Sequence, residues 1–121
     1  MWQWLVVLCV FGLQIAHEMA AWLGKGDEAA EWKARFESAA RAFNAKFFNK
    51  TGSTYYEYGR TATEYLSPQT CIALAVELDL VPADALEDVM RTLVHDVTVL
   101  HGGHLNTGIV GVKFLLPALQ R

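Results

Sequence analysis

The sequence predicts an all-α fold made of antiparallel helical hairpins, with about five helices in 121 residues and one short β-prone loop. In most of the chain, apolar residues recur at steps of three and four, which is the period of an amphipathic helix. Glycine and proline mark the ends of these stretches. The link between the first two stretches is short, and a short link places neighbouring helices antiparallel.

The first two helices are predicted over residues 2–23 and 27–48. The first is apolar on both faces at its start, which is typical of a helix buried in a larger protein. Gly24-Lys25-Gly26 marks its end, and Asp27 is predicted to cap the second helix. The apolar face of the second helix consists of Trp32, Phe36, Ala39, Ala40, Phe43 and Phe47. The two helices are therefore expected to form an αα-hairpin.

The stretch from 49 to 66 interrupts the helical pattern. Residues 54–58, which include three tyrosines, are β-prone and are predicted to form a short strand or an ordered loop. Ser67 is predicted as the N-cap of a third helix, with Pro68 at its first helical position. This helix is expected to end at about Asp79.

A fourth helix is predicted from Pro82 to about Val99, and a fifth from about Thr107 to Leu119, with the loop 101–104 between them. The apolar face of the fourth helix consists of Leu86, Val89, Met90, Leu93, Val94 and Val97. A glycine inside a helix costs about 1 kcal/mol relative to alanine. Gly102, Gly103, Gly108 and Gly111 therefore indicate a backbone that turns sharply and then packs closely against another element.

The composition is apolar for a domain of this size: 53% of residues are hydrophobic and 19% are charged. Such a chain can fill its own core or form part of a larger one. The net charge is −3 and the basic residues are scattered, so nucleic acid is not an expected partner. Cys9 and Cys71 lie in apolar helical surroundings, which favours free buried thiols over a disulfide.

The N-terminal residues 1–13 are apolar, but no lysine or arginine precedes them, as a secretion signal requires. Gln14, His17 and Glu18 interrupt the run before it is long enough to span a bilayer. The sequence therefore favours a cytoplasmic chain over a secreted one, and a membrane is not an expected partner. The less favoured alternative is a helical protein tethered through these residues.

Residues 102–118, GGHLNTGIVGVKFLLPA, resemble the GHL-[ST]-TG motif of bacterial α-L-rhamnosidases, glycoside hydrolase family 78. Segments 14–25, 27–48, 67–75 and 80–82 resemble other segments of that family, in the same order and at similar spacing. The resemblance covers residues 13–121. Asn106 replaces the usual serine or threonine, Val112 the usual threonine, and Asp79 the usual glycine.

The resemblance implies an (α/α)6 barrel, in which six helical hairpins form a ring and bind sugar at one mouth. Residues 1–121 would then be a single partial domain, the C-terminal-side hairpins of such a barrel. Hydrolysis in this family inverts the anomeric carbon and uses two carboxylates. The family's general acid lies upstream of these segments and its general base lies downstream, in a Trp-Glu-Arg-Trp segment that is absent here.

The resemblance therefore implies a piece of an α-L-rhamnosidase catalytic domain that is inactive alone, and no catalytic residue is assigned. Its expected partners are a rhamnoside in the full-length enzyme and the remaining barrel hairpins, or further copies of the chain bound through apolar helix faces. The alternative is a stand-alone helical module that uses such hairpins for binding.

Five residues are candidates for contact with sugar. His104 lies on a glycine-rich loop before a helix, where it can reach a barrel mouth or act as a structural histidine. Asn106 and Thr107 suit sugar hydroxyls, although capping of the fifth helix is favoured by their type and position. Tyr56 can stack on a sugar ring or pack against a hairpin edge. Gln69 can face the mouth or take part in capping the third helix.

No metal site or cofactor is predicted. The spacing of His95, His101 and His104 does not place all three on one helix face, and no cysteine pair supports them. Glu57 and Glu64 are the carboxylates of the loop region. Nothing in their spacing turns them toward one cleft, so solvated side chains are favoured over a catalytic pair.

Overall fold

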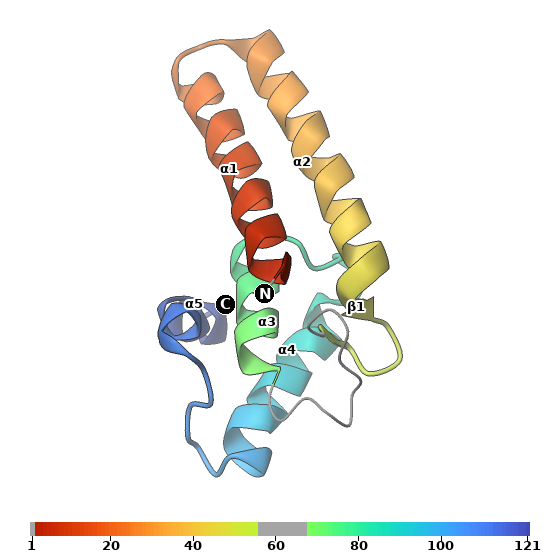
Figure 1. Ribbon diagram of the computed structural model, residues 1–121, viewed down its shortest axis with the longest axis vertical. Helices are drawn as coiled ribbons and strands as arrows, with labels where there is room; N and C mark the ends of the chain where they lie inside the picture. Colours follow the sequence, from red (N-terminus) through yellow and green to blue (C-terminus); the bar gives the residue numbers. More distant parts are fainter. Residues whose placement is uncertain (1, 56–67) are drawn as a thin grey trace. The chain divides into compact units, whose positions relative to one another are not determined.

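The computed structural model describes residues 2–55 and 68–121 (Figure 1). Within these residues the elements are α1 (Trp2–Trp22), α2 (Gly26–Phe47), β1 (Phe48–Asn49), β2 (Thr54–Tyr55), α3 (Gln69–Glu77), α4 (Leu86–His95), the π-helix η1 (Asp96–Leu100) and α5 (Ile109–Leu119). The predicted all-α fold is therefore confirmed. The chain divides into two compact units, Met1–Lys46 and Phe47–Arg121, which are described separately below.

The first unit is the predicted αα-hairpin, in which α1 and α2 lie side by side and antiparallel (Figure 1). Gly24 has a φ of +71°, the left-handed conformation that glycine adopts at little cost where a helix ends. His17 Nδ1 lies 2.9 Å from the carbonyl oxygen of Ala29 and so links the two helices. Asp27 is not the cap, because α2 begins at Gly26. It lies in the first turn instead, where its negative charge interacts favourably with the helix N-terminus.

The α1 helix exposes much of its apolar surface. Leu8, Met19 and Trp22 are all exposed, and Trp22 retains 82% of its accessible surface. Cys9 is exposed as well, so the prediction that it is buried is wrong, whereas Cys71 is buried in α3. The two cysteines do not form a disulfide with each other. Among the described helices, none combines the length and the apolar character needed to cross a membrane.

The second unit begins with a small antiparallel β-hairpin, which confirms part of the predicted β-prone stretch. Phe48 pairs with Tyr55, and Asn49 pairs with Thr54. The Asn49 side chain accepts hydrogen bonds from the backbone N–H groups of Thr51 and Gly52 and so shapes the turn. Burial raises the pKa of Tyr55 well above its ordinary value. Residues 56–58 of the predicted stretch lie outside the described part of the chain.

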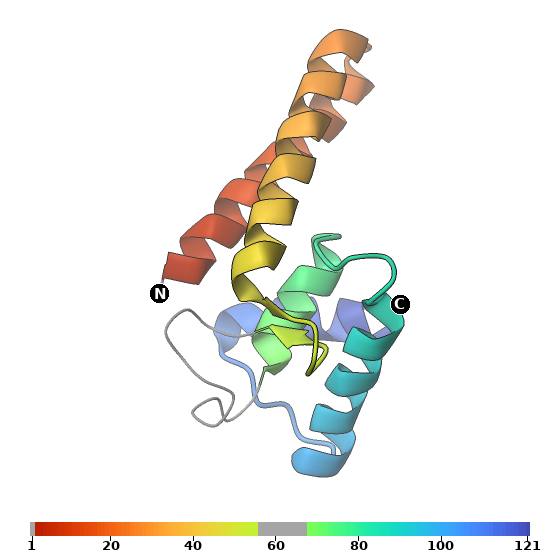
Figure 2. The same ribbon diagram turned by 90° about the vertical axis from the view of Figure 1, so that its right-hand side faces the viewer.

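The core of the second unit is built around α3. Six consecutive residues of this helix are buried: Cys71, Ile72, Ala73, Leu74, Ala75 and Val76. The α4 helix runs antiparallel to α3, and α5 crosses α3 at a steep angle (Figures 1 and 2). Val89 and Leu93 of α4 and Leu115 of α5 are fully buried. Leu86 and Val94, which were predicted on the buried face of the fourth helix, are instead exposed.

Three predicted helix starts in the second unit differ from the structure. Pro68 precedes α3 rather than occupying its first turn, because its carbonyl oxygen accepts the first intrahelical bond, from the N–H of Ile72. Ser67, the predicted cap, lies outside the described residues. Pro82 begins a turn closed by the N–H of Ala85, and α4 starts only at Leu86. The fifth helix starts at Ile109, two residues after the predicted Thr107.

Arg121 connects the ends of α3 and α5. Its Nη1 donates to Asp79 Oδ1 at 2.7 Å and to the carbonyl oxygen of Val76 at 3.0 Å, and its Nε lies 3.3 Å from Glu77 Oε1. Asp79 has a φ of +53°, the left-handed conformation that follows many helices and that favours glycine. Aspartate is one of the few other residues that tolerate it.

Candidate functional site

The loop between η1 and α5 turns through two glycines. Gly102 and Gly103 have φ values of +56° and +85°, which confirms that the Gly-Gly pair makes a sharp turn. The N–H of Gly103 donates to the carbonyl oxygen of Val97 at 2.7 Å, and the N–H of His104 donates to that of His101 at 2.9 Å. The loop therefore folds back onto the end of η1 before it enters α5.

Polar side chains from three parts of the second unit meet behind this loop. Gln69, at the start of α3, is fully buried, and its Nε2 donates to Asp96 Oδ1 at 2.8 Å. Its Oε1 accepts a hydrogen bond of 2.8 Å from the backbone N–H of Asn106. Asp96 is also buried, and its Oδ1 lies 3.1 Å from His101 Nδ1. On the other side of the imidazole, His101 Nε2 lies 3.1 Å from Asn106 Nδ2. The four side chains bridge α3, η1 and the loop.

Of the predicted sugar-contact residues, the structure brings Gln69 and Asn106 into contact. The side chains of His104 and Asn106 are exposed, and that of Thr107 is half-buried. Within the described residues, the buried hydroxyl oxygen of Thr107 has no hydrogen-bond partner. Tyr56 lies outside the described residues, as do Glu57 and Glu64.

The favoured prediction that Asn106 and Thr107 cap the fifth helix is wrong. Gly108 occupies the N-cap position of α5 in an extended conformation, and no side chain makes a capping hydrogen bond there. The reason lies in the polar cluster, because Asn106 is held toward Gln69 and His101 and so lies too far back along the chain to cap.

Sequence reasoning missed Asp96 and did not assign His101 to this cluster. One signal was available: Asp96 lies three residues after Leu93, in register with the buried face of the fourth helix. A carboxylate at such a position is rarely buried unless it has hydrogen-bond partners. Such a position indicates a partner elsewhere in the fold, although the sequence does not identify it.

Gly111 allows α5 to approach α3 closely, as its place in an apolar helix predicted. A Cβ atom at this position would overlap Thr70 Oγ1, and it would lie 2.9 Å from Thr107 Cβ and 3.0 Å from Thr70 Cγ2. Real Cβ atoms essentially never make contacts shorter than 3.0 Å. The absence of a side chain at Gly111 therefore fixes the spacing between the two helices that carry Gln69 and the loop.

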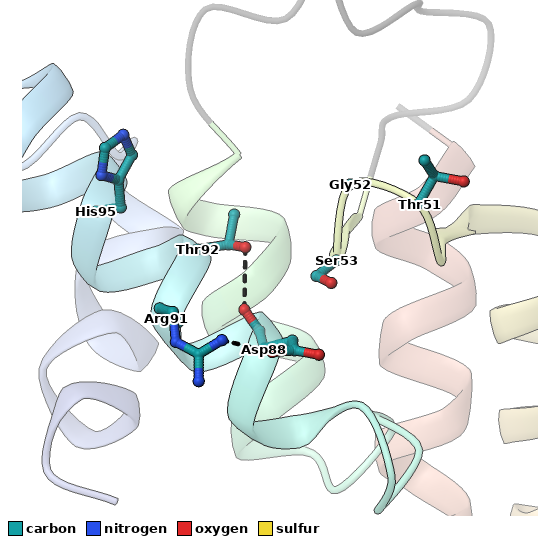
Figure 3. Close-up of a pocket in the computed structure, with 7 residues that line it drawn as sticks. All are labelled: Thr51, Gly52, Ser53, Asp88, Arg91, Thr92 and His95. Atoms are coloured by element: carbon teal, nitrogen blue, oxygen red, sulfur yellow. Dashed lines mark hydrogen bonds and ion pairs between the residues drawn. The ribbon is translucent and has the colours of Figure 1, made fainter.

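A separate open pocket of about 340 Å³ lies between the β-hairpin turn and α4 (Figure 3). Its lining residues are Thr51, Gly52, Ser53, Asp88, Arg91, Thr92 and His95. The Arg91 guanidinium is paired within α4, with Asp88 at 2.7 Å and Glu87 at 2.9 Å. None of the predicted sugar-contact residues lines this pocket.

The histidines considered for a metal site, His95, His101 and His104, do not form one. In residues 2–55 and 68–121, no group of three or more histidine, cysteine, aspartate or glutamate side chains could hold a metal ion.

Comparison with known proteins places these features in a family. A family profile described as the bacterial alpha-L-rhamnosidase 6 hairpin glycosidase domain matches residues 6–121. An alpha-L-rhamnosidase of Formosa agariphila is 28% identical over 109 residues, which are 90% of this chain and 11% of that protein. The solved structure of an alpha-L-rhamnosidase from Dictyoglumus thermophilum is similar with a TM-score of 0.68 and 29% identity, over 86% of this chain and 11% of that one.

The chain thus spans about a tenth of the length of the relatives that it matches. The profile match extends over both compact units and includes the loop, Gln69 and Gly111. The chain belongs to the family of bacterial α-L-rhamnosidase six-hairpin glycosidase domains.

Proposed function

We propose that residues 1–121 are the C-terminal-side hairpins of a partial (α/α)6 barrel in an α-L-rhamnosidase-like catalytic domain. The complete domain would hydrolyse terminal α-L-rhamnosides with inversion of the anomeric carbon. The names of both relatives support this substrate class. The observation that carries the proposal is the 2.8 Å hydrogen bond between Asn106 N–H and Gln69 Oε1, because it joins two rhamnosidase-like segments that lie 37 residues apart in sequence.

Inversion requires one carboxylic acid to protonate the leaving oxygen and one carboxylate to activate water. The segments that supply these groups in the family do not occur in these 121 residues. In our proposal this chain contributes sugar contacts instead. His104 and Asn106 are exposed on a loop with a defined backbone, so they are the first candidates, with Thr107 beside them.

Sugar binding by the loop can be tested by titrating the isotope-labelled chain with L-rhamnose while recording backbone and imidazole NMR signals. We expect saturable shifts, largest at His104 and Asn106, at millimolar sugar, because a few exposed contacts give weak binding. The His104→Ala variant removes one of the proposed contacts and should therefore reduce the shifts. Shifts confined to the pocket between the β-hairpin turn and α4, or no shifts at any sugar concentration, would contradict the proposed contacts.

Catalysis by the isolated chain is expected to be absent. Since general acid and general base catalysis each contribute about 10²–10⁴-fold, a chain without both groups should not hydrolyse aryl α-L-rhamnosides above a buffer blank. The measurement is release of the aryl group over hours at several pH values. Turnover that persists in a Glu57→Gln, Glu64→Gln double variant would show that other groups form an active site.

The chain is also expected to self-associate, because α5 presents an apolar stripe to solvent. Ile109 is 93% exposed, and Val112 and Leu116 follow on the same face at steps of three and four. Light scattering at micromolar concentration should show dimers or larger species. The Ile109→Lys, Leu116→Lys double variant should shift them toward monomer, whereas Glu87→Lys on the exposed surface of α4 should not. A sharp wild-type monomer of high thermal stability would instead support a stand-alone binding module.

A further inference from the structure

The four polar side chains behind the loop 101–108 form a closed ring. Gln69 contacts Asp96, Asp96 contacts His101, His101 contacts Asn106, and the backbone of Asn106 returns to Gln69. Every link is between 2.8 and 3.1 Å long. Gln69 is fully buried and Asn106 is exposed, so the ring connects the interior of the second unit to its surface.

The chemistry of the ring fixes the direction of each hydrogen bond. The N–H of Asn106 can only donate, so it must meet Oε1 of Gln69, and the Nε2 of Gln69 is then directed at Asp96. His101 Nδ1 also lies 3.1 Å from the carbonyl oxygen of Asp96, which can only accept. The proton of a neutral His101 is therefore on Nδ1, which leaves Nε2 to accept from Asn106 Nδ2.

Apart from the two backbone hydrogen bonds made by the N–H groups of Gly103 and His104, the loop has few other means of holding one conformation. Residues 102–106 are all exposed, so the burial of apolar side chains does little to order them. The two left-handed glycines permit the turn, but glycine is also the residue that loses most conformational freedom on folding. The polar ring ties the later part of the loop, at Asn106, to the buried side chain of Gln69.

We propose that Gln69 is a positioning residue. Through the ring with Asp96, His101 and Asn106, it holds the loop 101–108 in one conformation and presents His104 and Asn106 to a sugar. The sugar as ligand rests on the proposed function, whereas the ordering of the loop does not. A loop ordered before binding does not lose that conformational freedom when the ligand arrives. Gln69 thus acts on the ligand through Asn106.

The ring can be tested by amide hydrogen exchange in this chain without any sugar. Gln69→Glu removes the donor to Asp96 Oδ1 and brings two carboxyl groups into contact at a buried site. At a pH at which both are ionised, their repulsion should accelerate exchange of the Asn106 amide about tenfold relative to the core amide of Leu115. In the Gln69→Glu, Asp96→Asn double variant, the new amide at 96 can donate to the new carboxylate at 69. Because that amide nitrogen takes the place of Asp96 Oδ1, His101 Nδ1 then donates only to the backbone carbonyl oxygen of residue 96. Exchange at Asn106 should return to within about threefold of wild type.

The Thr70→Ala variant is the control, because it alters the same turn of α3 and leaves the ring intact. Asn106→Ala is a change at the surface that removes the contact with His101 Nε2. It therefore tests the ring even if the Gln69 variants fold poorly. It should accelerate exchange at His104 about threefold while Leu115 stays unchanged. Imidazole nitrogen shifts should show the Nδ1-protonated form of His101.

Several results would overturn the proposal. One is Asn106 exchange in Gln69→Glu that is unchanged, or that changes only in parallel with Leu115, which would make Gln69 a stabiliser of the whole unit. Another is a double variant no better protected than the single one, and a third is an Nε2-protonated His101. A failure of L-rhamnose to perturb His104 would count against the proposed function and would leave the exchange result untouched.

Discussion

Replacing Gly111 by valine is expected to lower the free energy of unfolding by about 2–3 kcal/mol, because the new side chain has no space between α5 and α3. A Cβ atom alone would overlap Thr70 Oγ1 and approach Thr107 Cβ to 2.9 Å. The neighbours are β-branched and stiff at χ1, so they do not rotate away at little cost. The helices would have to separate, which would open the core around Leu115. Urea denaturation followed by circular dichroism measures the loss.

Two further variants make this prediction specific. Thr70→Ala removes both Thr70 atoms that a side chain at 111 would meet, so it should recover part of the loss when combined with Gly111→Val. Gly108→Ala is the matched control, because Gly108 has a φ of −73° and open space around its Cβ position. It should change the stability by no more than about 0.5 kcal/mol. Equal losses for the two glycine variants would mean that close packing does not explain the effect at Gly111.

Replacing Gly103 by valine is expected to destabilise the second unit by about 1–3 kcal/mol through backbone strain alone. Its φ of +85° is a conformation that β-branched residues rarely adopt, and there is open space around the position, so no clash contributes. Gly103→Asn should cost less, because asparagine tolerates the left-handed region. Chemical denaturation of the two variants beside the wild type measures the difference.

The companion variant His104→Ala should change stability by no more than about 0.5 kcal/mol, since the side chain is exposed. Its effect should appear instead in the L-rhamnose titration. A large loss of stability for His104→Ala together with a small one for Gly103→Val would reverse the assignment of structural and ligand-facing roles within the loop.

The parts of this fold that sequence predicts are those that depend on local periodicity and on backbone chemistry. The recurrence of apolar residues located the five helices, and the Gly102–Gly103 turn and the close approach at Gly111 followed from the cost of glycine. Helix starts were less accurate: Pro82 and Thr107 have the residue types of helix beginnings, yet each precedes its helix by two or more residues. Tertiary hydrogen bonds and turns decide between such neighbouring positions.

The candidate site was only partly predictable, because its polar contacts join residues far apart in sequence. Gln69, His104 and Asn106 were named from their place in rhamnosidase-like segments. Their geometry depends on Asp96, which lies 27 residues from Gln69 along the chain. No local pattern indicates that a buried glutamine will meet a buried aspartate. The assignment of Asn106 as a helix cap failed for the same reason, since a distant partner competes for its backbone and side chain.

The contact of Arg121 with Asp79 has a consequence for how the sequence can diverge. Position 79 needs a residue that accepts a left-handed backbone, which glycine does without any partner. An aspartate there brings a negative charge, and Arg121 neutralises it from the end of another helix. We therefore expect positions 79 and 121 to covary among related sequences, with a cation at 121 more frequent where position 79 is aspartate than where it is glycine.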